Sequence, residues 1–324
     1  MKIGTFMTDA GVRYGLVLGD RWLDIPAATE KWEGETAPAR LIDFVAGGDH
    51  SLDQGNRLQC AAMVDPERFK GAWHDLRGAR YLPPFYPGGR LFTQRGNSCL
   101  FSRVCKLIQP EHPVWERRYT HNLTGHNQVC DYVGAGANPE FIAVIGPGGR
   151  EIPPEKIRDH IFGYTMMIDH SGFGREVFFE DWGVAECENE LVFRDHMFFG
   201  SWFGNSLPSN AVGPWIVTKD EIPDPYSLWV SAEEFYGDHV RLIGMVNSGS
   251  STFRFEDTLS FMSRILTLKP GDMLSTSSIG NDGYQFWDEM PAGSWLQTTC
   301  EKIGSLRMYF KAPAGEAKEQ EHDH

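Results

Sequence analysis

The chain lacks the features that mark membrane, secreted and zinc-stabilised proteins. No apolar run in its 324 residues reaches the roughly 18 residues of a membrane-spanning helix, and its first segment, MKIGTFMTDAGVRYG, has no apolar signal-peptide core. The six cysteines show no C-x-x-C spacing, which argues against structural zinc and against a disulfide framework. We therefore expect a cytoplasmic protein with reduced thiols.

Positive charge is also scarce. Against 44 aspartates and glutamates the chain has only 30 lysines and arginines, and its formal net charge is −14. Nucleic acids and anionic membranes would repel such a chain, because binding to either depends on attraction to positive side chains. We expect neither as a partner. Hydrophobic residues make up 41% of the sequence, which is enough to bury a large core in one or two domains.

Two strand-like segments carry the residues around which the chain is organised, NPEFIAVIG (138–146) and FGYTMMIDHSG (162–172). Alternate side chains of a strand share a face, so Asn138 and Glu140 lie on one side. The second segment is apolar until Asp169, which places a carboxylate at a strand end. Carboxylate and amide oxygens suit Mg²⁺ or Mn²⁺, so these three residues are candidate metal ligands. The alternative is a pair of strand-end acids that face solvent.

Six motifs then occur in an order that resembles the fumarylacetoacetate hydrolase superfamily: EFIAVIG, GYTMMIDHS, GPWIVT, VNSG, TLKPGDMLST and IGSLRMYF. The resemblance covers about residues 90–310. It implies a mixed, β-rich α/β fold with a β-roll catalytic domain, and a homodimer. It also implies Mg²⁺ or Mn²⁺ held by a Glu-x-Glu pair and a later Asp, in an enzyme that cleaves or rearranges β-diketo or 2-oxo acids.

The site residues of that family are only partly present. Its second Glu matches Glu140 and its Asp matches Asp169, whereas its first Glu falls on Asn138. Its active-site Lys falls near Asn205, which is the nearest polar side chain and our candidate for that position. Its histidine is missing from 97–101, the segment that resembles the family's Asn-Tyr-x-x-His. Chemistry that needs all of these groups cannot be carried over whole.

The segment ERRYTHNLTGH supplies further candidates. Arg117, Arg118 and Tyr119 lie where the resemblance places a basic residue that meets the substrate carboxylate, and an Arg fork suits a carboxylate because it donates two parallel hydrogen bonds. His121 and His126 are candidate general bases, because the pKa of an unperturbed histidine is close to neutrality. The alternatives are a solvated basic cluster and ordinary surface or core histidines.

Two later features complete the candidate site. Segment 173–203 contains seven Phe and two Trp, which predicts an active-site lid or an oligomer contact. His170, just before this segment, and His196, in its last part, are candidates to replace the missing histidine. Ser278 falls where the resemblance expects a substrate-binding Thr, and the alternative is an ordinary Ser-rich turn.

The chain divides at the Pro- and Gly-rich segment PPFYPGGR. Residues 1–85 are expected to form a small α+β domain, with strands in the first 25 residues and helices from 39 to about 69. Residues 86–313 form the catalytic domain, and the charged residues 314–324 a disordered tail. Within the catalytic domain, SSTFRF is predicted as a strand and EDTLSFMSRILTL as a helix with Leu259, Met262, Ile265 and Leu266 on its apolar face.

The resemblance and the residues present together lead us to expect a hydrolase or lyase that acts on a C–C bond beside a carbonyl in a small oxo or diketo acid from aromatic-compound catabolism, which is what the resemblance implies. The divalent cation would polarise the carbonyl and stabilise an enolate. Two alternatives stay open. One is a metal-independent isomerase, decarboxylase or hydratase in which Arg and His groups polarise the carbonyl. The other is a catalytically silent binding or partner subunit.

Overall fold

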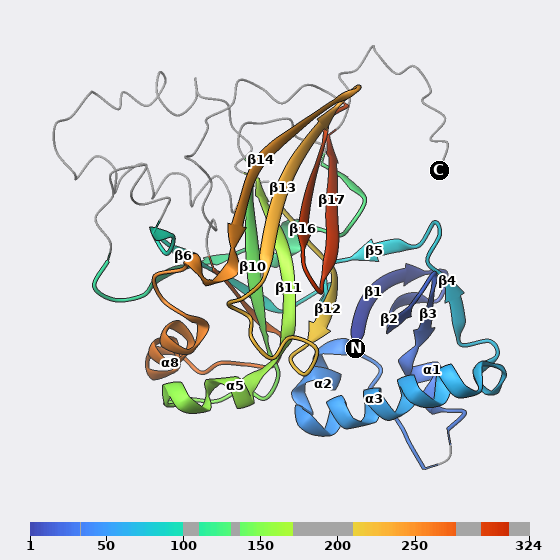
Figure 1. Ribbon diagram of the computed structural model, residues 1–324. Coiled ribbons are helices and arrows are strands. Elements are labelled where there is room, and N and C mark those ends of the chain that lie inside the picture. The colour runs from blue at the N-terminus through green and yellow to red at the C-terminus, as the bar shows by residue number, and fades with distance from the viewer. Residues whose placement is uncertain (33, 100–109, 131–136, 171–209, 277–292, 311–324) are drawn as a thin grey trace, which may run out of the picture.

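The structure, a computed structural model, describes residues 1–32, 34–99, 110–130, 137–170, 210–276 and 293–310. Its described part is a mixed α/β fold dominated by strands, as the sequence predicted (Figure 1). The strands form a larger and a smaller sheet, and neither sheet closes on itself. Among the described residues, no helix has the length and apolar character needed to cross a membrane.

An antiparallel meander opens the chain, as its alternating residues predicted. Its turns use Gly11 and Gly19, whose positive φ angles of 98° and 66° are accessible to glycine at little cost. Short helices then follow in the predicted helical region. The elements of this N-terminal module are β1 (Lys2–Thr8), β2 (Gly11–Leu18), β3 (Arg21–Asp24), α1 (Ile25–Thr29), α2 (Leu41–Ala46), α3 (Asp49–Val64), η1 (Pro66–Phe69), β4 (Trp73–Asp75) and β5 (Arg80–Leu82).

The larger sheet has twelve strands in the order β4-β3-β2-β1-β12-β11-β10-β15-β6-β7, with β5 beside β1 and β8 beside β12. Most neighbours are antiparallel, but β15 and β6 are parallel, as are β12 and β8. Its remaining members are β6 (Arg90–Arg95), β7 (Val114–Arg118), β8 (Leu123–Thr124), β10 (Ala137–Ile145), β11 (Ile161–His170), β12 (Asn210–Thr218) and β15 (Asp272–Ser275).

The smaller sheet has five strands in the order β14-β13-β16-β17-β9 and rises above the larger one in Figure 1. Its members are β9 (Gln128–Cys130), β13 (Trp229–Tyr236), β14 (His239–Asn247), β16 (Trp295–Cys300) and β17 (Gly304–Phe310). The short helical elements of this half of the chain are η2 (Thr120–Asn122), η3 (Pro154–Lys156), α5 (Ile157–His160), η4 (Ser248–Ser250) and α8 (Phe255–Ile265).

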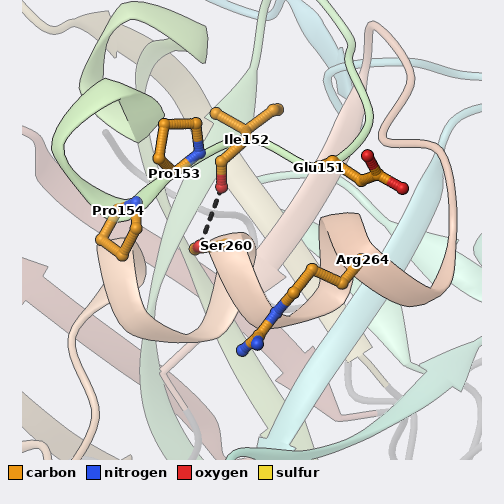
Figure 2. A pocket seen from close by; sticks show the side chains of 6 residues that line it. All are labelled: Glu151, Ile152, Pro153, Pro154, Ser260 and Arg264. Carbon is orange, nitrogen blue, oxygen red and sulfur yellow. Dashed lines mark hydrogen bonds between the residues drawn. The ribbon is translucent and has the colours of Figure 1, made fainter.

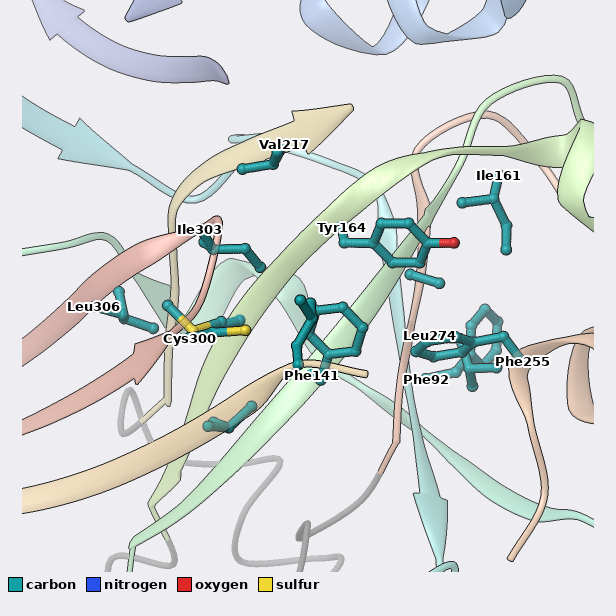
Figure 3. Close-up of a cluster of buried hydrophobic side chains, with 14 of the residues drawn as sticks. Phe92, Phe141, Ile161, Tyr164, Val217, Phe255, Leu274, Cys300, Ile303 and Leu306 are labelled. Carbon is teal, nitrogen blue, oxygen red and sulfur yellow. The ribbon is translucent and has the colours of Figure 1, made fainter. Parts of the chain in front are cut away.

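Two buried clusters hold the layers together, one on each face of the larger sheet. Phe141 and Tyr164 on that sheet stack with ring centroids 5.3 Å apart, in a cluster shared with the smaller sheet and α8 (Figure 3). On the opposite face, Ile142 and Val144 belong to a second cluster, shared with α1, α2 and α3 of the N-terminal module. Strand alternation sends consecutive residues of β10 to these two clusters in turn.

The segment before α8 corrects one prediction. SSTFRF is not a strand: it contains the end of η4, an isolated bridge at Ser251 and the residues that lead into the helix. The Asp257 carboxylate accepts a hydrogen bond from the backbone N–H of Arg254 at 3.0 Å and so caps the start of α8, which explains why these residues leave the extended conformation. On α8, Leu259 and Met262 are buried as predicted, but Ile265 is 58% exposed.

The N-terminal module does not have a sheet of its own. β1 pairs with β2 along one edge, and along its other edge it pairs first with β12, which places Ile3 opposite Ile216, and then with β5. One continuous sheet therefore crosses the boundary predicted near residue 85, and that division of the chain stays a prediction. The predicted lid at 173–203, with His196, and the predicted tail lie outside the described residues.

Candidate active site

Two buried carboxylates lie on one face of the larger sheet, at the end of β10 and β11 that is remote from α5. The register of the two strands places Asn138 opposite Asp169 and Glu140 opposite Met167. Glu140 and Asp169 are therefore diagonal neighbours, within reach of one ligand. They are only 2% and 7% exposed, so the alternative of solvent-facing acids does not describe them.

Glu140 is held by the neighbouring strand β15. The Ser275 hydroxyl donates a hydrogen bond to Glu140 Oε2, and Ser275 itself is fully buried. The end of β15 is fixed in turn by Asn97, whose side-chain amide donates to the carbonyl of Thr276 at 3.1 Å. Asn97 also accepts a hydrogen bond from the backbone of Phe253 at 2.7 Å. A buried carboxylate needs such partners, because its desolvation is otherwise costly.

Asp169 is held by a buried arginine. Arg118 Nη2 donates to Asp169 Oδ2 at 2.9 Å, and Arg118 Nε lies 3.0 Å from Glu116 Oε1 in a second ion pair. The arginine is 3% exposed, so the guanidinium charge lies inside the protein between acids from two strands. Removing one partner of such a buried pair leaves an uncompensated charge, which costs about 3–5 kcal/mol.

The path of the chain explains how β7 reaches β11. Strands β10, β15 and β6 separate the two along the sheet, yet the chain that leaves β7 at Arg118 forms η2 and then enters β8, which pairs with β12 on the far side of β11. The curved sheet therefore brings the end of β7 across to β11. Arg118, the last residue of β7, lies where this crossing begins.

A row of polar side chains connects these groups across the sheet. Thr93 on β6 lies in register with Glu116 on β7 and with Ser275 on β15, so all three share the face of Glu140. Thr93 is 1% exposed, and among the described residues its hydroxyl has no hydrogen-bond partner. An unpartnered buried hydroxyl is unusual in a native protein and is typical of a site that receives a ligand or water. Our sequence reasoning missed Thr93, Glu116 and Ser275. A polar residue within the apolar run of a strand is the signal that points to them.

The structure separates the other predicted substrate-binding residues from this row. Arg117 lies in register with Phe92, whereas Arg118 lies in register with Leu91, so the two arginines point to opposite faces of β7. Arg117 is exposed. Tyr119 is 57% exposed, and the exposed His121 contacts its ring. Of this predicted cluster, only Arg118 joins the buried acids.

His126 has a structural role that the prediction of a general base did not foresee. Its Nδ1 accepts a hydrogen bond from the backbone N–H of Arg307 at 3.1 Å, and its ring packs edge-on against Tyr81 with centroids 4.9 Å apart. Burial lowers the pKa of His126 to about 4, and the charge of Arg307 adds to this effect. The imidazole is therefore neutral near pH 7, with its proton on Nε2.

Four predicted residues fall outside what the structure describes. Asn205 and Ser278 lie in segments beyond the described ranges. The backbones of Asn138 and His170 belong to β10 and β11, but their side chains lie outside the described part of the molecule. Their assignments stay predictions.

The described residues do not by themselves fit a divalent cation. Asp169 accepts a hydrogen bond from Arg118, and Glu140 accepts one from Ser275. A Mg²⁺ or Mn²⁺ ion between the two carboxylates would come close to the guanidinium, whose like charge repels it. In the ranges that the structure describes, no three His, Cys, Asp or Glu side chains are grouped to hold a metal ion.

A separate depression of about 520 Å³ lies between α8 and the chain that follows β10 (Figure 2). It is at the opposite end of β10 from Glu140. Its one buried hydroxyl, on Ser260, already donates to the carbonyl of Ile152 at 2.8 Å. The other lining residues are Glu151, Pro153, Pro154 and Arg264. The one buried polar side chain of this depression therefore already has a hydrogen-bond partner, and the polar row is the better candidate for the active site.

Comparisons with known proteins identify the family of this chain. A family model described as Fumarylacetoacetate (FAA) hydrolase C-terminal matches residues 134–311, a range that includes Glu140, Asp169 and Ser275. Oxaloacetate tautomerase YisK of Bacillus subtilis (strain 168) is 24% identical over 310 residues, which are 90% of this chain and 94% of that protein.

Solved structures share the fold. Maleylpyruvate hydrolase from Sphingobium sp. SYK-6, in complex with manganese(II) ion and pyruvate, aligns with a TM-score of 0.67 at 18% identity over 96% of this chain and 99% of its own. The 2-hydroxyhepta-2,4-diene-1,7-dioate isomerase from Mycobacterium marinum aligns with a TM-score of 0.62 at 18% identity over 97% and 99%. At these identities the likeness supports the predicted architecture and not a particular reaction.

Proposed function

The chain belongs to the fumarylacetoacetate hydrolase superfamily, because the model of that family's C-terminal domain matches residues 134–311, and we propose that the chain is an enzyme acting beside a carbonyl group of a small oxo acid. The substrate is an oxo or diketo acid of the kind formed in aromatic-compound catabolism. The reaction passes through an enolate, and its product depends on what happens to that enolate. A homodimer is part of this proposal and is tested by light scattering.

The observation that carries the proposal is the buried ion pair between Arg118 and Asp169, on the same sheet face as Glu140 and as Thr93, whose hydroxyl has no partner among the described residues. A fixed positive charge in a site shielded from water stabilises negative charge that develops on a substrate oxygen. The neighbouring carboxylates can take or return a proton. The Thr93 hydroxyl can hydrogen-bond a carbonyl or carboxylate oxygen of the substrate.

The chemistry begins with loss of a proton from the carbon beside the carbonyl. The electron pair of the C–H bond passes into the carbonyl group, the oxygen becomes negative, and a carboxylate of the site accepts the proton. Return of a proton to the oxygen gives the enol. In a C–C hydrolase, a carboxylate of the site takes a proton from water while the water oxygen adds to a second carbonyl carbon of the substrate. That carbon becomes a carboxylic acid as the C–C bond breaks, and the electron pair of the broken bond forms the enolate, which takes the proton back.

The relatives support this common intermediate. One is a tautomerase of oxaloacetate, one a hydrolase of maleylpyruvate and one an isomerase of a hydroxydienedioate. Their substrates share a carbonyl or enol group next to a carboxylate. Two alternatives differ from our proposal in what the site contains or does. In one, Mg²⁺ or Mn²⁺ bound by Glu140, Asp169 and Asn138 polarises the carbonyl. In the other, the chain binds an oxo acid without turning it over.

The test follows the enol absorbance of oxaloacetate and the loss of maleylpyruvate with purified protein. We expect turnover of one of them and a loss of about 100-fold or more in kcat/KM for Glu140→Gln, since a proton-transfer group contributes at least that much. The control is Glu155→Gln, because Glu155 is exposed on η3. Binding of oxo acids without turnover of any of them would overturn the proposal in favour of a binding subunit. A Glu140→Gln enzyme as active as wild type would remove this site from it.

A further inference from the structure

We propose that Arg118 is the resident cation of this active site and that the site works without a divalent metal ion. This inference rests on the proposed function, because it names the group that stabilises the enolate. Its starting point is the misfit between the described residues and a Mg²⁺ or Mn²⁺ site. The positive charge that such an ion would supply is already present beside Asp169.

Arg118 is buried and is held in the site by two ion pairs. It is 3% exposed and bridges Asp169 on β11 and Glu116 on its own strand, at 2.9 and 3.0 Å. Two partners from different strands fix the guanidinium in place, so it needs little reorganisation when charge develops on a substrate oxygen. A lysine would be less well suited, since the planar fork of arginine matches carboxylate geometry.

The charges of the neighbouring residues on this face also bear on metal binding. Position 138, which faces Asp169 in the strand register, holds a neutral asparagine. The acids on this face are Glu116, Glu140 and Asp169, and Arg118 pairs with two of them, Asp169 and Glu116. A divalent cation between Glu140 and Asp169 would have to compete with the guanidinium for the Asp169 oxygens, and the guanidinium charge would repel it. A carboxylate or enolate oxygen of the substrate, in contrast, can accept a hydrogen bond from that guanidinium.

The experiment compares metal binding with activity. Wild-type protein dialysed against EDTA should contain no stoichiometric metal by mass spectrometry, and its turnover should change less than twofold. Its titration with Mn²⁺, followed by electron paramagnetic resonance, should show only weak binding. Arg118→Gln should bind Mn²⁺ about tenfold more tightly than wild type, because removing the guanidinium leaves the carboxylates unpaired. Arg118→Lys keeps the positive charge and should bind Mn²⁺ as weakly as wild type.

Arg117→Gln is the matched control, because Arg117 lies next to Arg118 but on the opposite face of β7. Its Mn²⁺ binding and turnover should equal those of wild type. Micromolar Mn²⁺ binding by wild type, with activity lost in EDTA and restored by Mn²⁺, would overturn the inference, and this arm needs no variant that could fail to fold. If no oxo acid is turned over, the proposed function fails, while the Mn²⁺ titrations still decide whether Arg118 takes the place of a metal ion.

Discussion

The hydroxyl of Ser275 and the carboxylate of Glu140 meet across the β15–β10 strand pair, and both are almost fully buried. The hydroxyl fixes one carboxylate oxygen, so the other is presented in a defined direction. Glu140 is thus positioned by a neighbouring strand and not by its own strand alone.

Ser275→Ala should reduce both stability and activity. It leaves a buried carboxylate oxygen without this donor, which costs about 1–3 kcal/mol in the free energy of unfolding. Urea denaturation measures the loss, and kcat should fall with it because Glu140 becomes less well oriented. Ser227→Ala is the control, because Ser227 is exposed. An unchanged kcat in Ser275→Ala would show that this hydrogen bond does not position Glu140 for the reaction.

Thr93→Val should affect activity without destabilising the protein. The Thr93 hydroxyl has no partner among the described residues, so a methyl group of similar shape removes a buried polar group at no loss of a hydrogen bond. The free energy of unfolding should stay equal or rise by up to about 1 kcal/mol, while KM for the oxo acid increases. Thr258→Val is the comparison, because that hydroxyl donates to Gln94 at 2.7 Å and its loss should destabilise the fold. A destabilised Thr93→Val with unchanged KM would assign Thr93 a structural role.

His126 should make the folded state sensitive to acid. Burial lowers its pKa to about 4 in the folded protein, so the unfolded chain, with an ordinary histidine, binds the proton more strongly. The contribution of neutral His126 to the free energy of unfolding is therefore complete above about pH 6.5 and is lost as the pH falls toward 4. Between pH 7 and pH 5 this residue should lower the free energy of unfolding by about 2 kcal/mol.

The variant His126→Gln tests this effect, since a glutamine amide oxygen can still accept the hydrogen bond from Arg307. Urea denaturation at both pH values should show a smaller difference for the variant than for wild type. His50→Gln, at an exposed position, should keep the wild-type difference. Turnover at pH 7 should survive in His126→Gln, and its complete loss would restore His126 as a candidate base.

Asn138→Glu should act differently in two backgrounds. Residue 138 faces Asp169 in the strand register, so a glutamate there adds a carboxylate beside Asp169 and Glu140. In the Arg118→Gln background, Mn²⁺ affinity should rise by about a further tenfold, because three acids then surround the ion. With Arg118 present, the gain should be smaller. Equal affinities for Arg118→Gln and the double variant would show that residue 138 does not contribute to this face.

The sequence could predict the strands of this site because their patterns are local. Alternation placed Asn138 and Glu140 on one side of their strand and Asp169 at the end of the next strand, but it left open whether the acids are buried. The meander at the N-terminus and α8 were predictable for the same reason. The strand predicted at SSTFRF was wrong, because the Asp257 cap on the backbone of Arg254 and contacts with the distant Asn97 decide the conformation of that segment.

The rest of the site depends on register between distant strands. Arg117 and Arg118 are both arginines and differ in the face of β7 to which each side chain points. The pairing of β7 with β6 decides which arginine lies on which face. Thr93 and Ser275 are separated by 182 positions in the sequence and become neighbours only when β6 and β15 pair. The burial of His126 likewise depends on its contacts with Tyr81 and Arg307.

The pairing of β1 with β12 has a consequence for any attempt to produce the catalytic half alone. Without residues 1–85, the β12 edge that pairs with Lys2 and Ile3 would be left with unpaired backbone donors and acceptors beside the apolar Ile216. An open edge of this kind recruits strands from other molecules. The N-terminal module therefore protects the protein against aggregation, and a fragment starting at residue 86 should form insoluble assemblies instead of a smaller enzyme.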